Sequence, residues 1–174
     1  MTIQDSFFQR FQSDDPVALA RKVEQDYQEL ALAGHDERRQ LEILSRLGPR
    51  LTILGKEQAA APLLEQALTL ARQFGEQRLE VSNLLNLATA QQYLGKRDLA
   101  QDLFQEALDK ARAYAQGEYE DFILHHQGRC FMEQGKREEA RTCFEQALAL
   151  RKSKGDQRGI DSTQRALDAL RALP

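Results

Sequence analysis

The sequence has little of what marks membrane, metal-binding or nucleic-acid-binding proteins. Only two of its 174 residues are cysteines, and Cys130 and Cys143 lack the CxxC spacing typical of metal sites. The 24 lysines and arginines are fewer than the 27 aspartates and glutamates, so the net charge of −3 gives no basic surplus for nucleic acid. No apolar run approaches the ~20 residues that span a bilayer. We therefore expect neither a nucleic-acid nor a membrane partner.

The N-terminal segment, MTIQDSFFQRFQSDD, also lacks the basic start and the apolar core of a secretory signal. These absences predict a cytoplasmic protein whose two cysteines are reduced thiols packed as small apolar groups. The composition, with 41% hydrophobic and 29% charged residues, is typical of a globular protein. The length predicts a single domain spanning residues 1–174.

An internal repeat is the strongest signal in the sequence. A shift of 40 residues aligns GKEQAAAPLLEQALTLAR, GKRDLAQDLFQEALDKAR and GKREEARTCFEQALALRK. Chance would give less than one column that is identical in all three copies. The identical columns are Gly55/Gly95/Gly135, Lys56/Lys96/Lys136, Ala60/Ala100/Ala140, Ala67/Ala107/Ala147, Leu68/Leu108/Leu148 and, upstream, Leu44/Leu84/Leu124.

The repeated columns have structural roles. The glycine suits a tight turn between two antiparallel helices, where a positive φ costs it little. Ala60 and Ala67 lie two helical turns apart on one face, where small side chains let helices approach, and Leu64 between them supplies bulk. Upstream, apolar residues at i, i+3, i+4 and i+7 from Leu44 predict an amphipathic helix. Each copy therefore predicts a pair of helices.

The pattern resembles the tetratricopeptide repeat, whose signature is L-G-x2-Y followed by A-x3-F and a further small residue. The unit is longer than the 34 residues of the family, and in this it is similar to the extended variant of kinesin light chain and of bacterial peptide receptors. The resemblance implies an all-α, right-handed superhelical solenoid of antiparallel helix pairs with about eight or nine helices. The copies carry the signature at Leu47-Gly48, Ala60 and Leu64, at Leu87-Ala88, Ala100 and Phe104, and at Gln127-Gly128, Ala140 and Phe144.

The resemblance covers roughly residues 14–174. In the N-terminal part, Ala20 and Tyr27 are predicted to take the same register as Ala60 and Ala67. Pro49 and Pro62 each remove a backbone donor, so we expect them to bend or loosen their helices. The predicted pieces are a degenerate unit (1–35), full repeats (about 36–75, 76–115 and 116–155) and a capping helix (156–174).

In the tetratricopeptide family, the first helix of each pair lines a concave face on which ligands lie. The resemblance therefore implies a protein-interaction adaptor that binds a peptide or protein segment without a cofactor. Asn86 resembles the groove asparagine that several family members use to bond a peptide backbone, although it is also interpretable as a solvated polar residue. Glu42 and Arg46 are spaced to neutralise each other. The predicted binding residues are Arg46, Ser82, Asn86, Thr89, Tyr93, Phe122, His125, His126 and Arg129.

Two alternatives stay open. The first concerns Phe7, Phe8 and Phe11, which form either a lid on the next helix or an exposed patch that makes a self-associating module, a homodimer for example.

The second is a metal-dependent activity at His125, His126 and Cys130, since His126 and Cys130 have a workable spacing for two ligands. The simpler interpretation is a buried thiol and two groove histidines, which would make ligand binding change between pH 5 and 8. No phosphate-binding loop or catalytic arrangement is evident, so we expect no enzyme.

Overall fold

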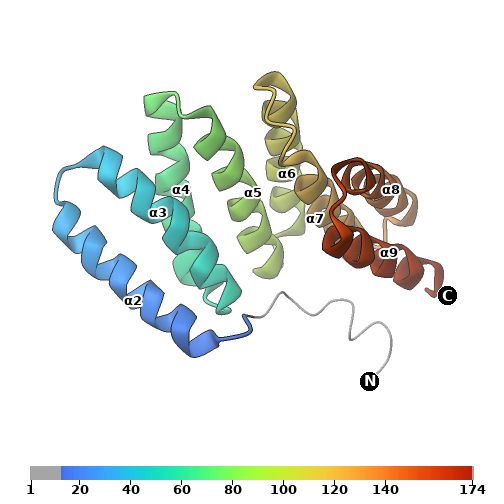
Figure 1. Cartoon of the computed structure of the whole chain (residues 1–174), viewed down its shortest axis with the longest axis horizontal. Helices are drawn as coiled ribbons and strands as arrows, with labels where there is room; N and C mark the ends of the chain where they lie inside the picture. Colours follow the sequence, from blue (N-terminus) through green and yellow to red (C-terminus); the bar gives the residue numbers. More distant parts are fainter. Residues whose placement is uncertain (1–12, 174) are drawn as a thin grey trace. The chain divides into compact units, whose positions relative to one another are not determined.

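The structure is a computed structural model that describes residues 13–173. This part of the chain contains eight helices joined by short turns, and it contains no strand (Figure 1). The all-α repeat fold predicted from the sequence is confirmed. Phe7, Phe8 and Phe11 lie outside the described residues, so both interpretations of that cluster stay predictions. The helices are α2 (Pro16–Ala33), α3 (Glu37–Ile53), α4 (Glu57–Phe74), α5 (Gln77–Tyr93), α6 (Arg97–Ala113), α7 (Glu120–Glu133), α8 (Arg137–Lys154) and α9 (Gln157–Arg171).

The turn within each helix pair has the conformation that the repeated glycine suggested. Gly55, Gly95 and Gly135 have φ angles of 75°, 79° and 75°. After Gly55, the backbone N–H of Lys56 donates to the carbonyl of Leu51 at 2.9 Å, and the other two turns repeat this bond. The left-handed glycine thus lets the chain satisfy carbonyl groups at the end of the first helix.

A second turn column, between successive pairs, was not recognised in the sequence. Gly75 and Gly155 end α4 and α8 with φ angles of 66° and 68°. Ala115 occupies the same place after α6 with a φ of 55°, and it is the only described residue other than glycine with a positive φ. A left-handed alanine costs roughly 1 kcal/mol relative to glycine. The sequence did not predict this turn column because one of its three members is an alanine rather than a glycine.

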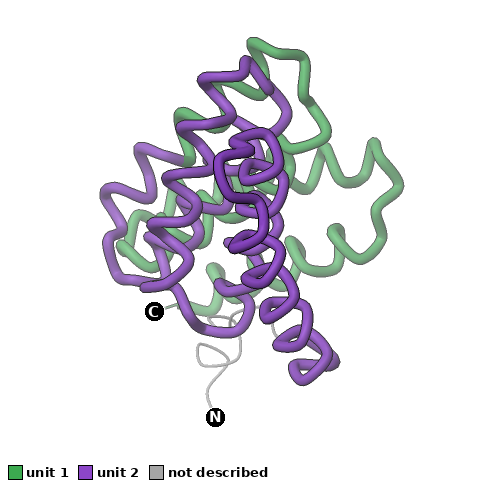
Figure 2. Tube along the Cα trace, turned by 90° about the vertical axis from the view of Figure 1, so that its left-hand side faces the viewer, with its two compact units in different colours: residues 1–9, 104–174 green, residues 10–103 purple. Residues whose placement is uncertain are grey.

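The chain forms two compact units, residues 10–103 and a unit that includes residues 104–174, and each is described by itself (Figure 2). In the first unit, a core of Leu41, Leu44, Ala67, Leu70 and Ala71 joins α3 to α4, with apolar side chains of α2 and α5 packed around it. The boundary falls inside α6. The assignment of one domain over residues 1–174 stays a prediction.

In the second unit, α7 and α8 pack as an antiparallel pair and α9 packs on α8. Its core combines Met132, Ala140 and Phe144 with Leu167 and Leu170 of α9. The apolar face of α9 is therefore buried, while its opposite face is polar and exposed.

One expectation about the N-terminal half needs correction. In α2, Ala20 is exposed and Tyr27 is 38% exposed, whereas Val23 and Asp26 are the buried residues. The predicted register was wrong because ion pairs with α3, rather than small apolar residues, select the buried face of α2. α3 continues through Pro49 and α4 continues through Pro62, so neither proline ends its helix, and the expected bending or loosening stays a prediction.

Candidate functional site

The first helix of each pair is called the A helix below, and α3 and α5 are the A helices of the unit of residues 10–103. These two helices contact each other. Five of the predicted binding residues lie on them, and all five side chains are half-buried. The surface that they form is called the A-helix surface, and its residues are Arg46, Ser82, Asn86, Thr89 and Tyr93.

Arg46 is held by α2. Its Nε lies 2.7 Å from Oδ1 of Asp26, and its Nη2 lies 2.5 Å from Oε2 of Glu29. The hydrogen bond to Asp26 raises the pKa of Arg46 above its ordinary value. The predicted pairing of Arg46 with Glu42 is wrong, because Glu42 pairs with Arg39 at 3.1 Å. The positive charge of Arg46 is thus neutralised within the protein.

Asn86 has an amide that is not engaged elsewhere. Ser82 and Thr89 donate their hydroxyl protons to the carbonyls of Leu79 and Leu85, at 3.2 Å and 2.9 Å. Within the described residues, Asn86 makes no such bond, so both its acceptor and its donors are available. The A-helix surface therefore presents one open amide beside side chains that are already bonded.

Asn83, one turn before Asn86, was missed as a notable residue. It is fully buried, and its Nδ2 donates to Oγ of Ser45 at 2.9 Å. Its Oδ1 has no hydrogen-bond partner among the described residues. The sequence does contain a signal for Asn83, because this polar residue stands in a column where the other copies have the apolar residues Ile43 and Ile123.

The other four predicted residues lie on α7, in the unit that includes residues 104–174. Phe122 is 47% exposed, with the guanidinium carbon of Arg151 5.4 Å from its ring centroid. His125 and Arg129 are buried, each at 7% exposure. His126 stacks on Phe104 with 6.4 Å between ring centroids. His125 and Arg129 thus lie largely inside the unit and His126 is half-buried, and the binding row that includes them stays a prediction.

The electrostatics of the two histidines follow from this burial. Burial, together with the nearby charges of Arg129 and Arg151, lowers the pKa of His126 to about 3. Burial, His126 and the same two arginines lower the pKa of His125 well below its ordinary value. His126 therefore does not change its protonation between pH 5 and 8, so it cannot cause the predicted change of ligand binding in that range.

A buried polar network that the sequence did not reveal ties α7, α8 and α9 together. Asp121 is 1% exposed and accepts a hydrogen bond from Nε of Arg151 at 3.0 Å. The other end of the guanidinium donates to Oγ1 of Thr163 at 2.6 Å. Nδ1 of His125 lies 3.2 Å from the same hydroxyl. The four residues come from three different helices, so spacing along the chain could not have placed them together.

The metal alternative finds no support in the described part of the chain. No group of three or more histidine, cysteine, aspartate and glutamate side chains there is arranged to hold a metal ion. Cys130 and Cys143 are both free and buried. None of the helices in this part of the chain is both long enough and apolar enough to cross a membrane.

Comparison with known proteins identifies the repeat. The family model of the tetratricopeptide repeat matches residues 80–153, which hold most of α5 to α8. These residues contain tetratricopeptide repeats. The six columns that are identical in all three copies recur over the matched region and before it.

Solved TPR structures share the fold. The crystal structure of BtubC (BKLC) from P. vanneervenii matches with a TM-score of 0.71 and 23% identity, over 88% of this chain and 66% of that chain. A Podospora anserina protein described as a kinesin light chain with nearly identical TPR-like repeats matches with a TM-score of 0.65 and 20% identity. This match covers 88% of this chain and 86% of that chain. The chain thus spans slightly less than two thirds of BtubC. At these identities the likeness shows the fold alone. No match was found among curated proteins.

Proposed function

We propose that this TPR protein is a non-catalytic scaffold or adaptor that binds an extended segment of a partner protein on the A-helix surface. TPR helix pairs serve in general as protein-interaction modules, and in the family the A helices line the binding face. The observation that supports the proposal is the half-buried amide of Asn86, which makes no hydrogen bond within the described residues. A cytoplasmic location stays a prediction.

The chemistry of the A-helix surface favours a main-chain ligand. An extended peptide offers N–H and C=O groups in alternation, and an asparagine amide pairs with both regardless of the ligand's side chains. Asp26 and Glu29 already neutralise Arg46, so the surface offers no open positive charge to an acidic tail. Tyr93, at the end of α5, adds an aromatic ring of the kind that anchors ligands at interfaces.

The test compares two amide-to-alanine variants. Asn86→Ala removes the open amide, whereas Gln66→Ala removes an exposed amide from α4, outside the A-helix surface. Proteins captured by the wild type are quantified by mass spectrometry, and the affinity of the main partner is then measured directly. We expect Asn86→Ala to weaken that affinity about tenfold, because one or two hydrogen bonds are lost. Equal capture by both variants would refute the proposal.

A further inference from the structure

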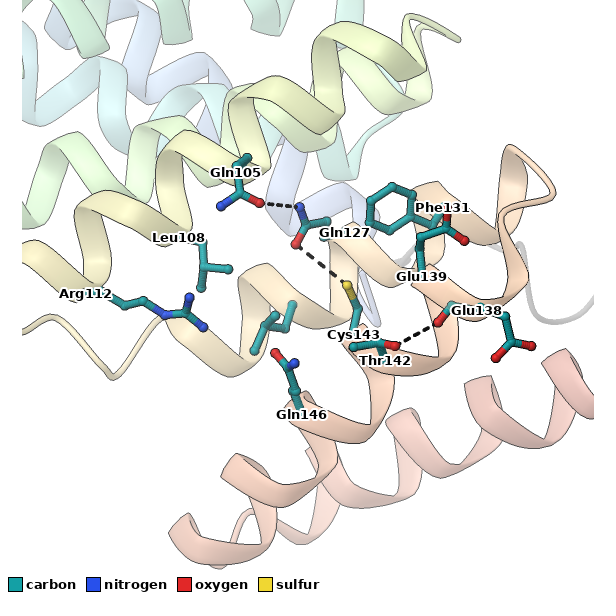
Figure 3. A pocket seen from close by; sticks show the side chains of 11 residues that line it. Gln105, Leu108, Arg112, Gln127, Phe131, Glu138, Glu139, Thr142, Cys143 and Gln146 are labelled. Atoms are coloured by element: carbon teal, nitrogen blue, oxygen red, sulfur yellow. Dashed lines mark hydrogen bonds between the residues drawn. The ribbon is translucent and has the colours of Figure 1, made fainter.

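A pocket of about 420 Å³ lies among α6, α7 and α8, and all of its lining residues belong to the unit that includes residues 104–174 (Figure 3). Leu108, Leu124 and Phe131 supply its apolar surface. Gln127 of α7 and Cys143 of α8 are both buried, at 5% and 8% exposure. The side chain of Gln127 lies between Gln105 of α6 and Cys143 (Figure 3). The site is built by other helices than the A-helix surface and does not rest on the proposed function.

The pocket coincides with two columns in which the third repeat departs from the other two. Gln127 stands where the other copies have Leu47 and Leu87. Cys143 stands where they have Leu63 and Leu103.

A thiol is shorter than an isobutyl group and leaves space, and an amide in place of a leucine brings polar atoms into it. The change at Gln127 gives up the burial of a leucine side chain, which is worth about 1.5–3 kcal/mol, since Leu47 and Leu87 are buried. The change at Cys143 gives up less, because Leu63 and Leu103 are half-buried. Stability of the fold alone therefore does not explain why Gln127 and Cys143 stand in these two columns.

The polar atoms of the pocket are joined by long contacts. Nε2 of Gln127 donates to Oε1 of Gln105 at 3.4 Å. The thiol of Cys143 lies 3.8 Å from Oε1 of Gln127. A thiol is a weak donor, so the carbonyl oxygen of Gln127 remains a good acceptor for a stronger one. An entirely apolar occupant would cover this amide without bonding it, which is unfavourable.

The charges around the pocket leave one carboxylate open. Arg112 pairs with Glu120 at 3.2 Å, and Glu138 pairs with Arg141 at 3.2 Å. Glu139, which also lines the pocket, makes no ion pair or hydrogen bond within the described residues.

Nζ of Lys136 lies over the ring of Phe131, 5.7 Å from its centroid, and does not pair with Glu139. Burial and the charge of Glu139 raise the pKa of Cys143 to about 11, so the thiol is neutral and is not a nucleophile at neutral pH.

We propose that this pocket binds an arginine side chain of a partner protein, with its aliphatic stem on the leucines and its guanidinium between Glu139 and the carbonyl oxygen of Gln127. Arginine combines an apolar stem with five planar N–H donors, so one head group can serve a carboxylate and an amide oxygen together. An acidic side chain would face the open carboxylate of Glu139. A lysine carries its three donors on a single nitrogen and reaches two separated acceptors less well.

The test uses nuclear magnetic resonance of the isotope-labelled full chain, with Nα-acetyl-arginine N-methylamide as the probe. The matching citrulline compound has the same shape without the charge. We expect the arginine probe to cause saturable shifts of the backbone amides around Gln127 and Cys143, with a dissociation constant on the order of a millimolar for so small a ligand. The citrulline probe should bind at least about tenfold more weakly.

Two variants and a control complete the experiment. Cys143→Leu restores the leucine of the other repeats and fills the pocket, so the shifts should disappear. Glu139→Gln should weaken binding of the arginine probe to the level of citrulline. Glu145→Gln, an exposed position on α8 outside the pocket, should leave binding unchanged.

Equal binding of the two probes, shifts that persist in Cys143→Leu, or equal effects at the two glutamates would each overturn the proposal. If Cys143→Leu does not fold, the comparison of Glu139→Gln with Glu145→Gln decides it. Neither result depends on Asn86.

Discussion

At the scale of single residues, the absence of a side chain at Gly128 determines how closely α7 approaches α8. A Cβ atom there would lie 2.8 Å and 2.9 Å from two ring atoms of Phe144. Gly48 has the same relation to Leu64, whose Cδ2 would lie 2.4 Å from an added Cβ. A glycine inside a helix costs up to about 1 kcal/mol relative to alanine, and close packing offsets that cost.

Gly128→Ala should therefore destabilise the protein although it improves helix propensity. The added methyl group overpacks the ring of Phe144, which is fully buried and cannot move aside. Overpacking costs on the order of 1–3 kcal/mol, which exceeds the gain in propensity. Urea denaturation measures the free energy of unfolding. Gly117→Ala is the control, because the nearest atom to its added Cβ would be 3.7 Å away. A stabilising effect of Gly128→Ala would contradict this account of the helix contact.

Equivalent positions in successive repeats have different surroundings, as Arg46, Asn86 and His126 show. All three residues, spaced by 40, are among the predicted binding residues. Arg46 is neutralised by two carboxylates of α2, and Nδ1 of His126 is buried. The side chain of Asn86 makes no hydrogen bond or ion pair within the described residues. Periodicity predicts the register of a residue, whereas its neighbours on other helices decide what it is free to bind.

At the scale of helices, α2 is attached to α3 by charge more than by apolar packing. Only two of its side chains, Val23 and Asp26, are buried. Asp26 is 2% exposed, and both Arg46 and Arg50 donate to its carboxylate. A buried carboxylate of this kind is stable only while its partners are in place.

Asp26→Ala should loosen α2 specifically. Removing one partner of a buried pair costs about 3–5 kcal/mol, and we expect a smaller loss, about 2 kcal/mol, because the two arginines are partly exposed and solvent screens them. Hydrogen exchange of the α2 amides should accelerate more than exchange in α4. Glu24→Ala, at an exposed position of the same helix, serves as the control. Uniform acceleration over both helices would argue against attachment through Asp26.

At the scale of the whole molecule, a small set of columns maintains the TPR fold across very different sequences. BtubC has a similar structure with 23% identity. The glycines of the turns, the paired alanines and the bulky residue between them are enough to predict the helix pairs, since their roles are local. The remaining positions can vary, and this chain uses some of them for buried polar groups such as Asp121 and His125.

The buried histidines should make global stability depend on pH. The folded-state pKa of His126, about 3, lies below the ordinary value of 6.5. The unfolded chain therefore binds more protons between these values, and stability falls as the pH drops below about 6.5. His126 alone should remove about 2 kcal/mol between pH 7.5 and pH 5.

Denaturant titrations at several pH values measure this slope, that is, how steeply the free energy of unfolding changes with pH. His126→Gln should flatten it, and His35→Gln, at an exposed position, should not. An unchanged slope in His126→Gln would contradict the assignment.

The sequence by itself determined the helices, their pairing and the glycine turns, because backbone conformation and apolar periodicity act over a few residues and recur every 40. It also placed Asn86 on an A helix. Only the tertiary structure decided that Asp26 neutralises Arg46, that His125 is buried beside Thr163, and that Gln127 and Cys143 form a pocket with α6. Those features join residues 16 to 38 positions apart on different helices, and burial and charge depend on which helices meet.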